Sequence, residues 1–233
     1  MYGLPLSLTT LGSQVLGRYA GASGISGLFL VARWRWTPYQ QIASYLPTHG
    51  NILDLGCGHG LLSLAMGLSE PTRTILAIDH EPWRVAVAQK AVSDLANIAV
   101  ETGSLLDTIA AEHWHGTVAG IVIIDAIHYL TPDEQVAFLD HARKALMPGG
   151  VLLIRDVDAS AGKTFFINRL YEKMMTGLGF TMAKNLNFRS QAEWLNLLEK
   201  AGFDCTTEPC CRFPFADRLF VCRLRAAQTA LAA

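Results

Sequence analysis

The 233-residue chain contains 51% hydrophobic and only 17% charged residues, and its formal net charge is −1 at neutral pH. A chain of this length and apolar content can build one domain around a large buried sheet. The near-zero charge argues against a nucleic-acid-binding protein, because such proteins neutralise phosphates with an excess of lysine and arginine. The five cysteines form no C-x-x-C pair and follow no signal peptide. We therefore expect reduced thiols, no metal site and a cytoplasmic protein.

Residues 1–50 precede the first expected strand and are predicted to be largely helical. Within them, residues 28–36 combine apolar bulk with two arginines and two tryptophans. This composition is typical of a helix that lies on a membrane surface, which for this protein would be the inner membrane. It is also typical of a helix that covers the core while its arginines extend to water. Both interpretations remain open. Pro38 then begins a helix from Tyr39 to Leu46.

The stretch from residue 51 to residue 60 predicts a ligand cradle. Ile52 to Leu55 form a short buried strand, three alternating glycines follow, and a helix begins at Leu61. Glycines allow positive φ and let a ligand approach the backbone. Their G-x-G-x-G spacing differs from the G-x-G-x-x-G of dinucleotide-binding proteins, which argues against a Rossmann oxidoreductase. A second buried strand, 75–79, ends in Asp79, which lies 19 positions after Gly60 in the sequence. In doubly wound folds an acid at about this sequence distance from the glycine loop hydrogen-bonds the ribose hydroxyls.

The pattern D-x-G-x-G-x-G, which begins at Asp54, resembles motif I of the class I S-adenosylmethionine (SAM)-dependent methyltransferases, of the kind that acts on small molecules (type 11/12 domain). The resemblance covers roughly residues 38–158. It implies an α/β fold: a doubly wound seven-stranded sheet, mostly parallel with an antiparallel last strand, and helices on both faces. Residues 51–233 would form the methyltransferase domain, and residues 1–50 would lie over the cofactor and substrate site.

The remaining expected elements agree with this fold. Further strands are predicted at 97–101, 120–125 and 151–154, with a Pro-Gly-Gly turn at 148–150 before the last of these. Thr131 and Ser190 each open a helix with a capping box. Residues 203–207 and 219–224 are expected to pair as an antiparallel hairpin at the sheet edge, where Pro214 in the connection is tolerated.

The resemblance implies SAM as the cofactor and assigns contact residues to it. In the family an acid usually follows the glycine at 103 and accepts a hydrogen bond from the adenine amine, whereas this chain has Ser104. The expected cofactor-binding residues are Tyr39, Asp54, Gly56, Cys57, Gly58, Gly60, Asp79, His80, Ser104, Leu105 and Asp125.

Candidate catalytic residues follow the fourth and fifth strands. The resemblance places the segment after strand four beside the reactive methyl, so His128 and Tyr129 are candidates, with Asp156 as a further base. The alternative for Arg155, Asp156 and Asp158 is that they pair with one another as an ionic cluster.

Residues 159–189 are not required by the fold. A helix at 165–175 with aromatic and methionine side chains suits a substrate cap over an apolar pocket, or equally a helix that packs on the core. The acceptor that fits best is a small apolar or aromatic molecule, lipid-like or carrier-bound. A protein methyltransferase and a non-catalytic SAM-binding scaffold remain as alternatives. The sequence does not indicate an oligomeric state.

Overall fold

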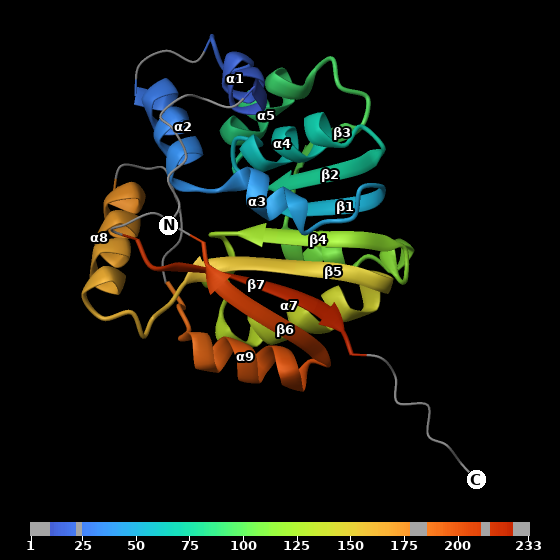
Figure 1. Ribbon diagram of the computed structural model, residues 1–233, viewed down its shortest axis with the longest axis vertical. Coiled ribbons are helices and arrows are strands. Elements are labelled where there is room, and N and C mark those ends of the chain that lie inside the picture. The colour runs from blue at the N-terminus through green and yellow to red at the C-terminus, as the bar shows by residue number, and fades with distance from the viewer. Residues whose placement is uncertain (1–9, 22–24, 178–185, 211–214, 226–233) are drawn as a thin grey trace.

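The computed structural model describes residues 10–21, 25–177, 186–210 and 215–225. Its centre is a seven-stranded sheet in the order β3-β2-β1-β4-β5-β7-β6 (Figure 1). The first five strands are parallel, and β7 runs antiparallel to both of its neighbours. This confirms the predicted sheet. The strands are β1 (Gly50–Leu55), β2 (Arg73–Asp79), β3 (Ile98–Thr102), β4 (Val118–Ile124), β5 (Leu146–Val157), β6 (Phe203–Pro209) and β7 (Asp217–Leu224).

Helices cover both faces of the sheet, as predicted. One core layer joins the sheet to α1 (Thr10–Gly17), α2 (Ile25–Trp36), α3 (Tyr39–Ser44), α4 (Leu61–Ser69) and α5 (Pro82–Val92). The other layer lies between the opposite face and α6 (Leu105–Ala110), α7 (Pro132–Ala145) and α9 (Gln191–Lys200). Short 3-10 turns occupy Glu112–Trp114 and Ile127–Tyr129, and α8 spans Lys163–Gly177.

The buried strands explain why the sheet lies between two helical layers. Every residue of β4 is buried, as are the last four residues of β1, so both faces of these strands need apolar cover. Both predicted capping boxes, at Thr131 and Ser190, are present. The parallel strands all point toward one end of the molecule, and α2 and α8 lie beyond that end (Figure 1).

The predicted turn at 148–150 is instead part of β5. Leu146 pairs with Val118 and Val151 pairs with Gly120, so residues 147–150 bulge outward between two pairings with β4. Gly149 has φ of 82°, a conformation that favours glycine. The chain therefore changes direction within a strand rather than before it.

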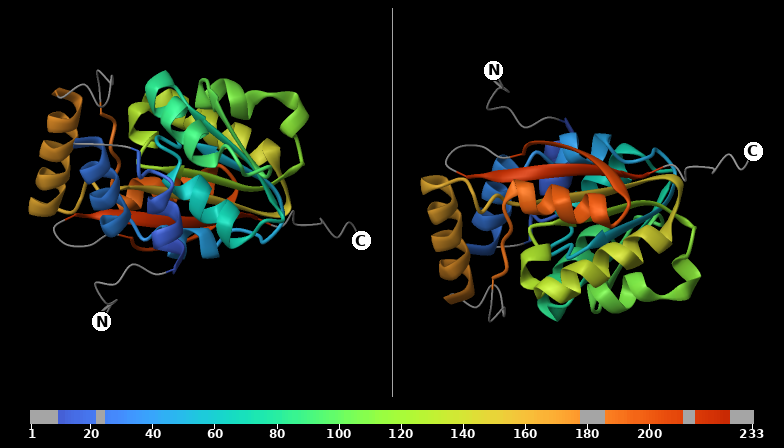
Figure 2. Two further views of the ribbon diagram at one scale, coloured as in Figure 1. Left: turned by 90° about the horizontal axis from the view of Figure 1, so that it is seen from above. Right: turned by 90° about the horizontal axis from the view of Figure 1, so that it is seen from below.

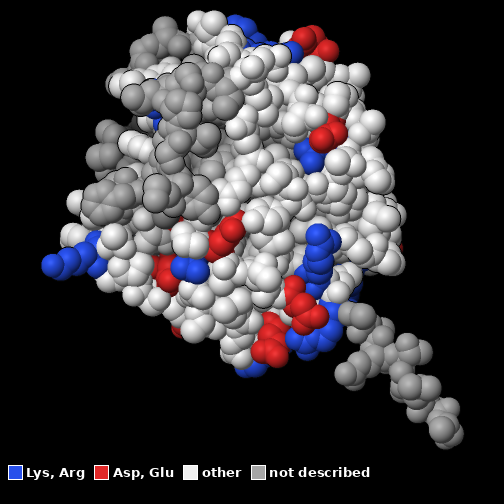
Figure 3. Space-filling model, viewed as in Figure 1, with Lys and Arg blue, Asp and Glu red and all other residues white. Residues whose placement is uncertain are grey.

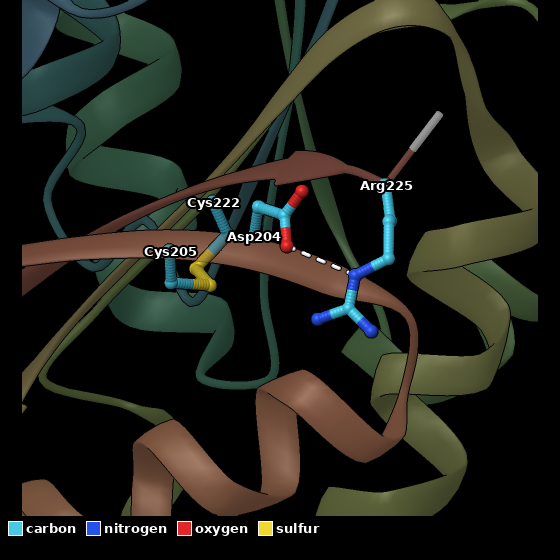
Figure 4. The surroundings of a disulfide bond; sticks show 4 residues. All are labelled: Asp204, Cys205, Cys222 and Arg225. Atoms are coloured by element: carbon cyan, nitrogen blue, oxygen red, sulfur yellow. Dashed lines mark hydrogen bonds and ion pairs between the residues drawn. A yellow bond between two sulfur atoms is a disulfide. The ribbon is translucent and has the colours of Figure 1, made fainter. Parts of the chain in front are cut away.

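The expectation of reduced thiols is wrong for two of the five cysteines. Cys205 of β6 and Cys222 of β7 form a disulfide, beside the Asp204–Arg225 ion pair (Figure 4). These two cysteines are direct cross-strand partners with Cα atoms 4.2 Å apart. Their separation of 17 residues gives no sign of this pairing, which the antiparallel register alone creates. Cys57 and Cys210 are free.

The surface in Figure 3 carries few charged side chains, and those visible are of both signs and gather mainly in its lower half. Acidic and basic groups lie next to one another there. Among the described residues, this face therefore carries no patch of a single sign.

Candidate active site

A cavity of about 460 Å³ lies at the carboxyl ends of β1, β2 and β4, beneath α2. All of the predicted cofactor-binding residues except Gly60 line it, and so does Tyr129. The cavity is also lined by residues that the sequence did not single out. Those used below are Phe29, Arg33, His59, Leu61, Leu62, Arg84 and Leu130.

The glycine loop is held in place by backbone hydrogen bonds. The amides of Gly56 and Cys57 both donate to the carbonyl of Ile78, at 2.8 and 2.9 Å. A Cβ on Gly56 would lie 2.6 Å from the Cβ of Ala126, so only glycine fits. Gly58 has no atom within 4 Å of the position its Cβ would take, and it lines the cavity. Gly60 instead begins α4 in a left-handed conformation and packs against Ala88.

Asp79 is oriented by the backbone around it. One carboxylate oxygen accepts the amide of Gly58 at 2.8 Å, and the other accepts the amide of Glu81 at 3.0 Å. Asp79 is 4% exposed, so its remaining lone pairs face the cavity rather than bulk water. The neighbouring His80 lies at the rim, with its ring 57% exposed and 3.2 Å from the carboxylate of Glu81.

Asp54 is buried at the end of β1 and accepts a hydrogen bond from the hydroxyl of Ser63. Burial raises the pKa of Asp54 to about 7, and the charge of Asp79 adds to the effect. A cation placed in the cavity would favour the ionised form of Asp54. The carboxyl is therefore suited to an ammonium ligand.

Ser104 and Leu105 line the far side of the cavity at the start of α6. The hydroxyl of Ser104 caps this helix and accepts the amide of Asp107 at 3.3 Å. Its oxygen keeps a second lone pair, because a hydroxyl can accept two hydrogen bonds.

A buried chain of charges links α2 to the sheet. Arg33 of α2 and Arg155 of β5 both donate to the carboxylate of Asp125, and Arg155 also pairs with Asp217 at 3.0 Å. Burial would raise the pKa of Asp125, but Arg155 and Arg33 hold it below its usual value. Asp125 is also the one non-glycine residue in the described ranges with positive φ, 52°. Tyr39 lies beside this cluster, and burial raises the pKa of its hydroxyl.

The predicted partners of Arg155 are therefore wrong. Neither Asp156 nor Asp158 pairs with it. Asp158 accepts the amides of Ser160 and Gln191 at 2.9 and 3.0 Å, which fixes the start of the segment that leads to α8.

His59 and Arg84 are cavity residues that sequence reasoning missed. Burial lowers the pKa of His59 to about 4, and the nearby Arg84 acts in the same direction. The ring of His59 lies between Phe29 and Trp83, with centroids 5.7 and 5.1 Å away. His59 Nε2 and Arg84 Nε are buried without a hydrogen-bond partner in the described part of the chain. The position of His59 between two of the glycines was the one available sequence signal.

His128 and Asp156 form a buried pair beside the cavity. His128 Nδ1 lies 2.7 Å from Asp156 Oδ1, and neither side chain is exposed. Tyr129 lines the cavity, whereas His128 does not. The His128 ring instead packs edge-on against Tyr129 and at a tilt against Phe188, with centroids 4.3 and 4.5 Å away, and Phe188 contacts Phe165 of α8 at 5.5 Å.

A doubly wound sheet whose first strand leads into an open glycine loop, with acids ending β1 and β2, defines a nucleoside-binding enzyme of the class I methyltransferase type. Sequence comparison agrees: residues 32–208 match the family model described as "Methyltransferase domain". The chain therefore belongs to the methyltransferase domain family. This membership implies SAM as the cofactor.

Curated relatives carry a more specific name. A carboxy-S-adenosyl-L-methionine synthase of Geobacter metallireducens is 26% identical over 188 residues, which cover 77% of this chain and 75% of the relative. The synthase of Vibrio atlanticus is 27% identical over 117 residues, 48% of this chain and 46% of that protein. The chain thus aligns with about half the length of the Vibrio relative.

Solved structures share the fold at lower identity. The mitomycin 7-O-methyltransferase MmcR has a TM-score of 0.63 and 20% identity, over 86% of this chain and 55% of its own. The O-methyltransferase NcsB1 from neocarzinostatin biosynthesis, solved with SAM and 2-hydroxy-5-methyl naphthoic acid, has a TM-score of 0.57 and 22% identity, over 80% of this chain and 53% of its own.

Proposed function

We propose that this chain transfers the methyl group of SAM to a small apolar or aromatic acceptor. The observation that carries the proposal is the cavity wall itself, which joins the glycine loop and both strand-end acids to an apolar side. The apolar part of the lining includes Phe29, Leu61, Leu62, Tyr129 and Leu130. SAM supplies a methyl group that its sulfonium already makes electrophilic, so the protein mainly has to align the acceptor and exclude water.

The residues present fit SAM. Asp79 offers carboxylate lone pairs to ribose hydroxyls, and Asp54 offers a buried carboxyl to the ammonium of the methionine part. Gly58 leaves open space where a side chain would otherwise block the ligand. Ser104 lies where the family has its adenine contact, and its free lone pair can accept from the adenine amine.

We propose that His128 accepts the proton that the acceptor loses, and that Asp156 fixes the orientation of the His128 imidazole. Because a carboxylate only accepts, Nδ1 of His128 donates to it, and Nε2 is then the basic nitrogen. An acceptor hydroxyl of a phenol type could pass its proton there as the methyl arrives. Because the Phe188 ring packs against this imidazole at 4.5 Å, an acceptor that reaches Nε2 would also contact Phe188. Residues 159–189 would thus act as a cap that determines which acceptor fits.

The function is tested by incubating the purified protein with deuteromethyl-labelled SAM and a panel of phenols, hydroxy-naphthoic acids, fatty acids and carrier-bound aryl acids. Mass spectrometry should show the label on an apolar or aromatic acceptor. Labelling of proteins alone, or SAM binding with no labelled product in a cell extract, would favour the protein-methyltransferase or scaffold alternative.

A second candidate ligand is a carboxylated SAM, in view of the named relatives. The observation that favours it is Arg84, whose Nε faces no hydrogen-bond acceptor in the described residues although it lines the cavity. A carboxylate on the ligand would supply that acceptor. Native mass spectrometry of the protein as purified from cells distinguishes the two ligands by mass.

A further inference from the structure

The outer side of α8 is apolar, which is unusual for a surface helix. Phe166, Ile167 and Leu170 are 67, 39 and 59% exposed, and their i, i+1, i+4 spacing places them on one stripe. The opposite side of the helix is anchored, because the buried Asn168 accepts the amide of Ala216 at 3.0 Å. This anchor holds the apolar stripe outward.

The helix α2 repeats this arrangement at the same end of the molecule. Leu28, Val31 and Trp36 are 73, 37 and 40% exposed. Phe29 and Arg33 of α2 line the cavity. Trp36 lies at the end of the helix, on the same side as Phe29, and packs against Phe215 with ring centroids 5.4 Å apart. In both views of Figure 2, α8 forms the outer edge of the molecule at this end, with α2 behind it. The apolar surface and the cover of the cavity therefore belong to the same element.

The charges on these two helices have one sign. All of their described charged side chains are cations: Arg33, Arg35, Lys163 and Arg169. Arg33 forms an ion pair with Asp125 inside the protein, whereas the other three cations are exposed. The sequence of α8 also contains Glu172 and Lys173, whose opposite charges cancel. Arg35, Lys163 and Arg169 thus lie among exposed apolar side chains at one end of a chain whose net charge is −1.

Exposed aromatic and aliphatic groups flanked by cations are complementary to an anionic lipid surface. Here the exposed apolar side chains belong to α8, the outermost helix at this end (Figure 2), and to α2. None of the helices in the described residues is long and apolar enough to cross a membrane. Contact would therefore be peripheral.

We propose that this end of the protein, called the cap surface here, binds the surface of an anionic bilayer. On the proposed function, a lipid-like acceptor would then pass from the bilayer to the cavity beneath α2. The cap surface comprises Leu28, Val31, Arg35, Trp36, Lys163, Phe166, Ile167, Arg169 and Leu170.

The test is flotation of the full-length protein with vesicles of phosphatidylcholine alone, or with about one third phosphatidylglycerol, in the absence of SAM and acceptor. The parent should float with the anionic vesicles and much less with the neutral ones. Phe166→Ser/Leu170→Ser should weaken this binding at least tenfold, because two inserted side chains are lost. Lys163→Gln/Arg169→Gln should weaken it by about 30-fold at low salt, which corresponds to roughly 1 kcal/mol for each of the two cations.

A matched control is Val136→Ser/Met147→Ser. These residues are 50 and 40% exposed but lie on α7 and at the start of β5, away from the cap surface. This control should bind vesicles like the parent, and all variants should bind SAM with unchanged affinity.

Absence of vesicle binding by the parent, or equal loss in the control, would overturn the proposal. Binding to a purified acidic acyl carrier protein without vesicle binding would do so as well, and would assign the cap surface to a protein partner. Because no methyl transfer is measured, failure here is separate from failure of the proposed function.

Discussion

The buried carboxyl of Asp54 predicts that SAM binding depends on pH. In the free protein burial raises its pKa to about 7, so the neutral form predominates below that value. The ammonium of SAM would hold the bound carboxyl ionised, and the proton must therefore leave as SAM binds. Affinity should increase as the pH rises through the pKa.

The size of the effect follows from the ionised fraction of Asp54. With a pKa of about 7, this fraction is about 0.03 at pH 5.5 and about 0.5 at pH 7, so the apparent Kd should fall about 16-fold, or ~1.6 kcal/mol. This pH range stays below the pKa of a typical α-amino group, about 7.7–8, so the ligand remains an ammonium throughout.

Isothermal titration calorimetry with SAM at four pH values in this range measures the effect, and buffers of different ionisation enthalpy count the released proton. Asp54→Asn keeps the shape and the hydrogen bond to Ser63 but cannot ionise, so it should bind more weakly and with little pH dependence. A parent Kd that changes less than twofold would refute the reasoning, as would an equal slope in Asp54→Asn. The same shift makes the free protein progressively less stable as the pH rises from the ordinary pKa of 3.8 to about 7, because the unfolded carboxyl loses its proton first; above 7 this loss is complete.

Other substitutions test the rest of the site. Asp79→Ala should weaken SAM binding by about 1.5–3 kcal/mol, since it removes a charge-assisted hydrogen bond to the ribose. Gly58→Val should abolish binding, because the valine side chain would occupy the cavity. Calorimetry measures both affinities, and parent-like values would contradict the assignment of the SAM site. His128→Ala should lower turnover by about 10²–10⁴ while SAM still binds, and His128→Gln should not restore it; near-parent turnover in the glutamine variant would make His128 a positioning residue. Replacing residues 165–175 by a short loop should leave SAM affinity within about threefold and eliminate methyl transfer, whereas global unfolding, seen by circular dichroism, would make α8 a core helix.

The sequence alone determined the sheet and the cofactor cradle, because both depend on local patterns. Buried runs such as 120–124 predict parallel strands, and the glycines from Gly56 to Gly60 predict a loop open to a ligand. Strand-end acids such as Asp54 and Asp79 need no further information, since parallel strands bring their carboxyl ends to one edge.

Only the tertiary structure decided the contacts between distant segments. Arg33 meets Asp125 across 92 positions, and Cys205 meets Cys222 through the antiparallel register. The structure also placed Tyr129 on the cavity wall and turned His128 toward Asp156 and Phe188. Neighbours in a tight turn point in different directions, and no periodicity records which one faces the ligand. Long-range pairing and side-chain direction are set by packing, which a linear pattern does not encode.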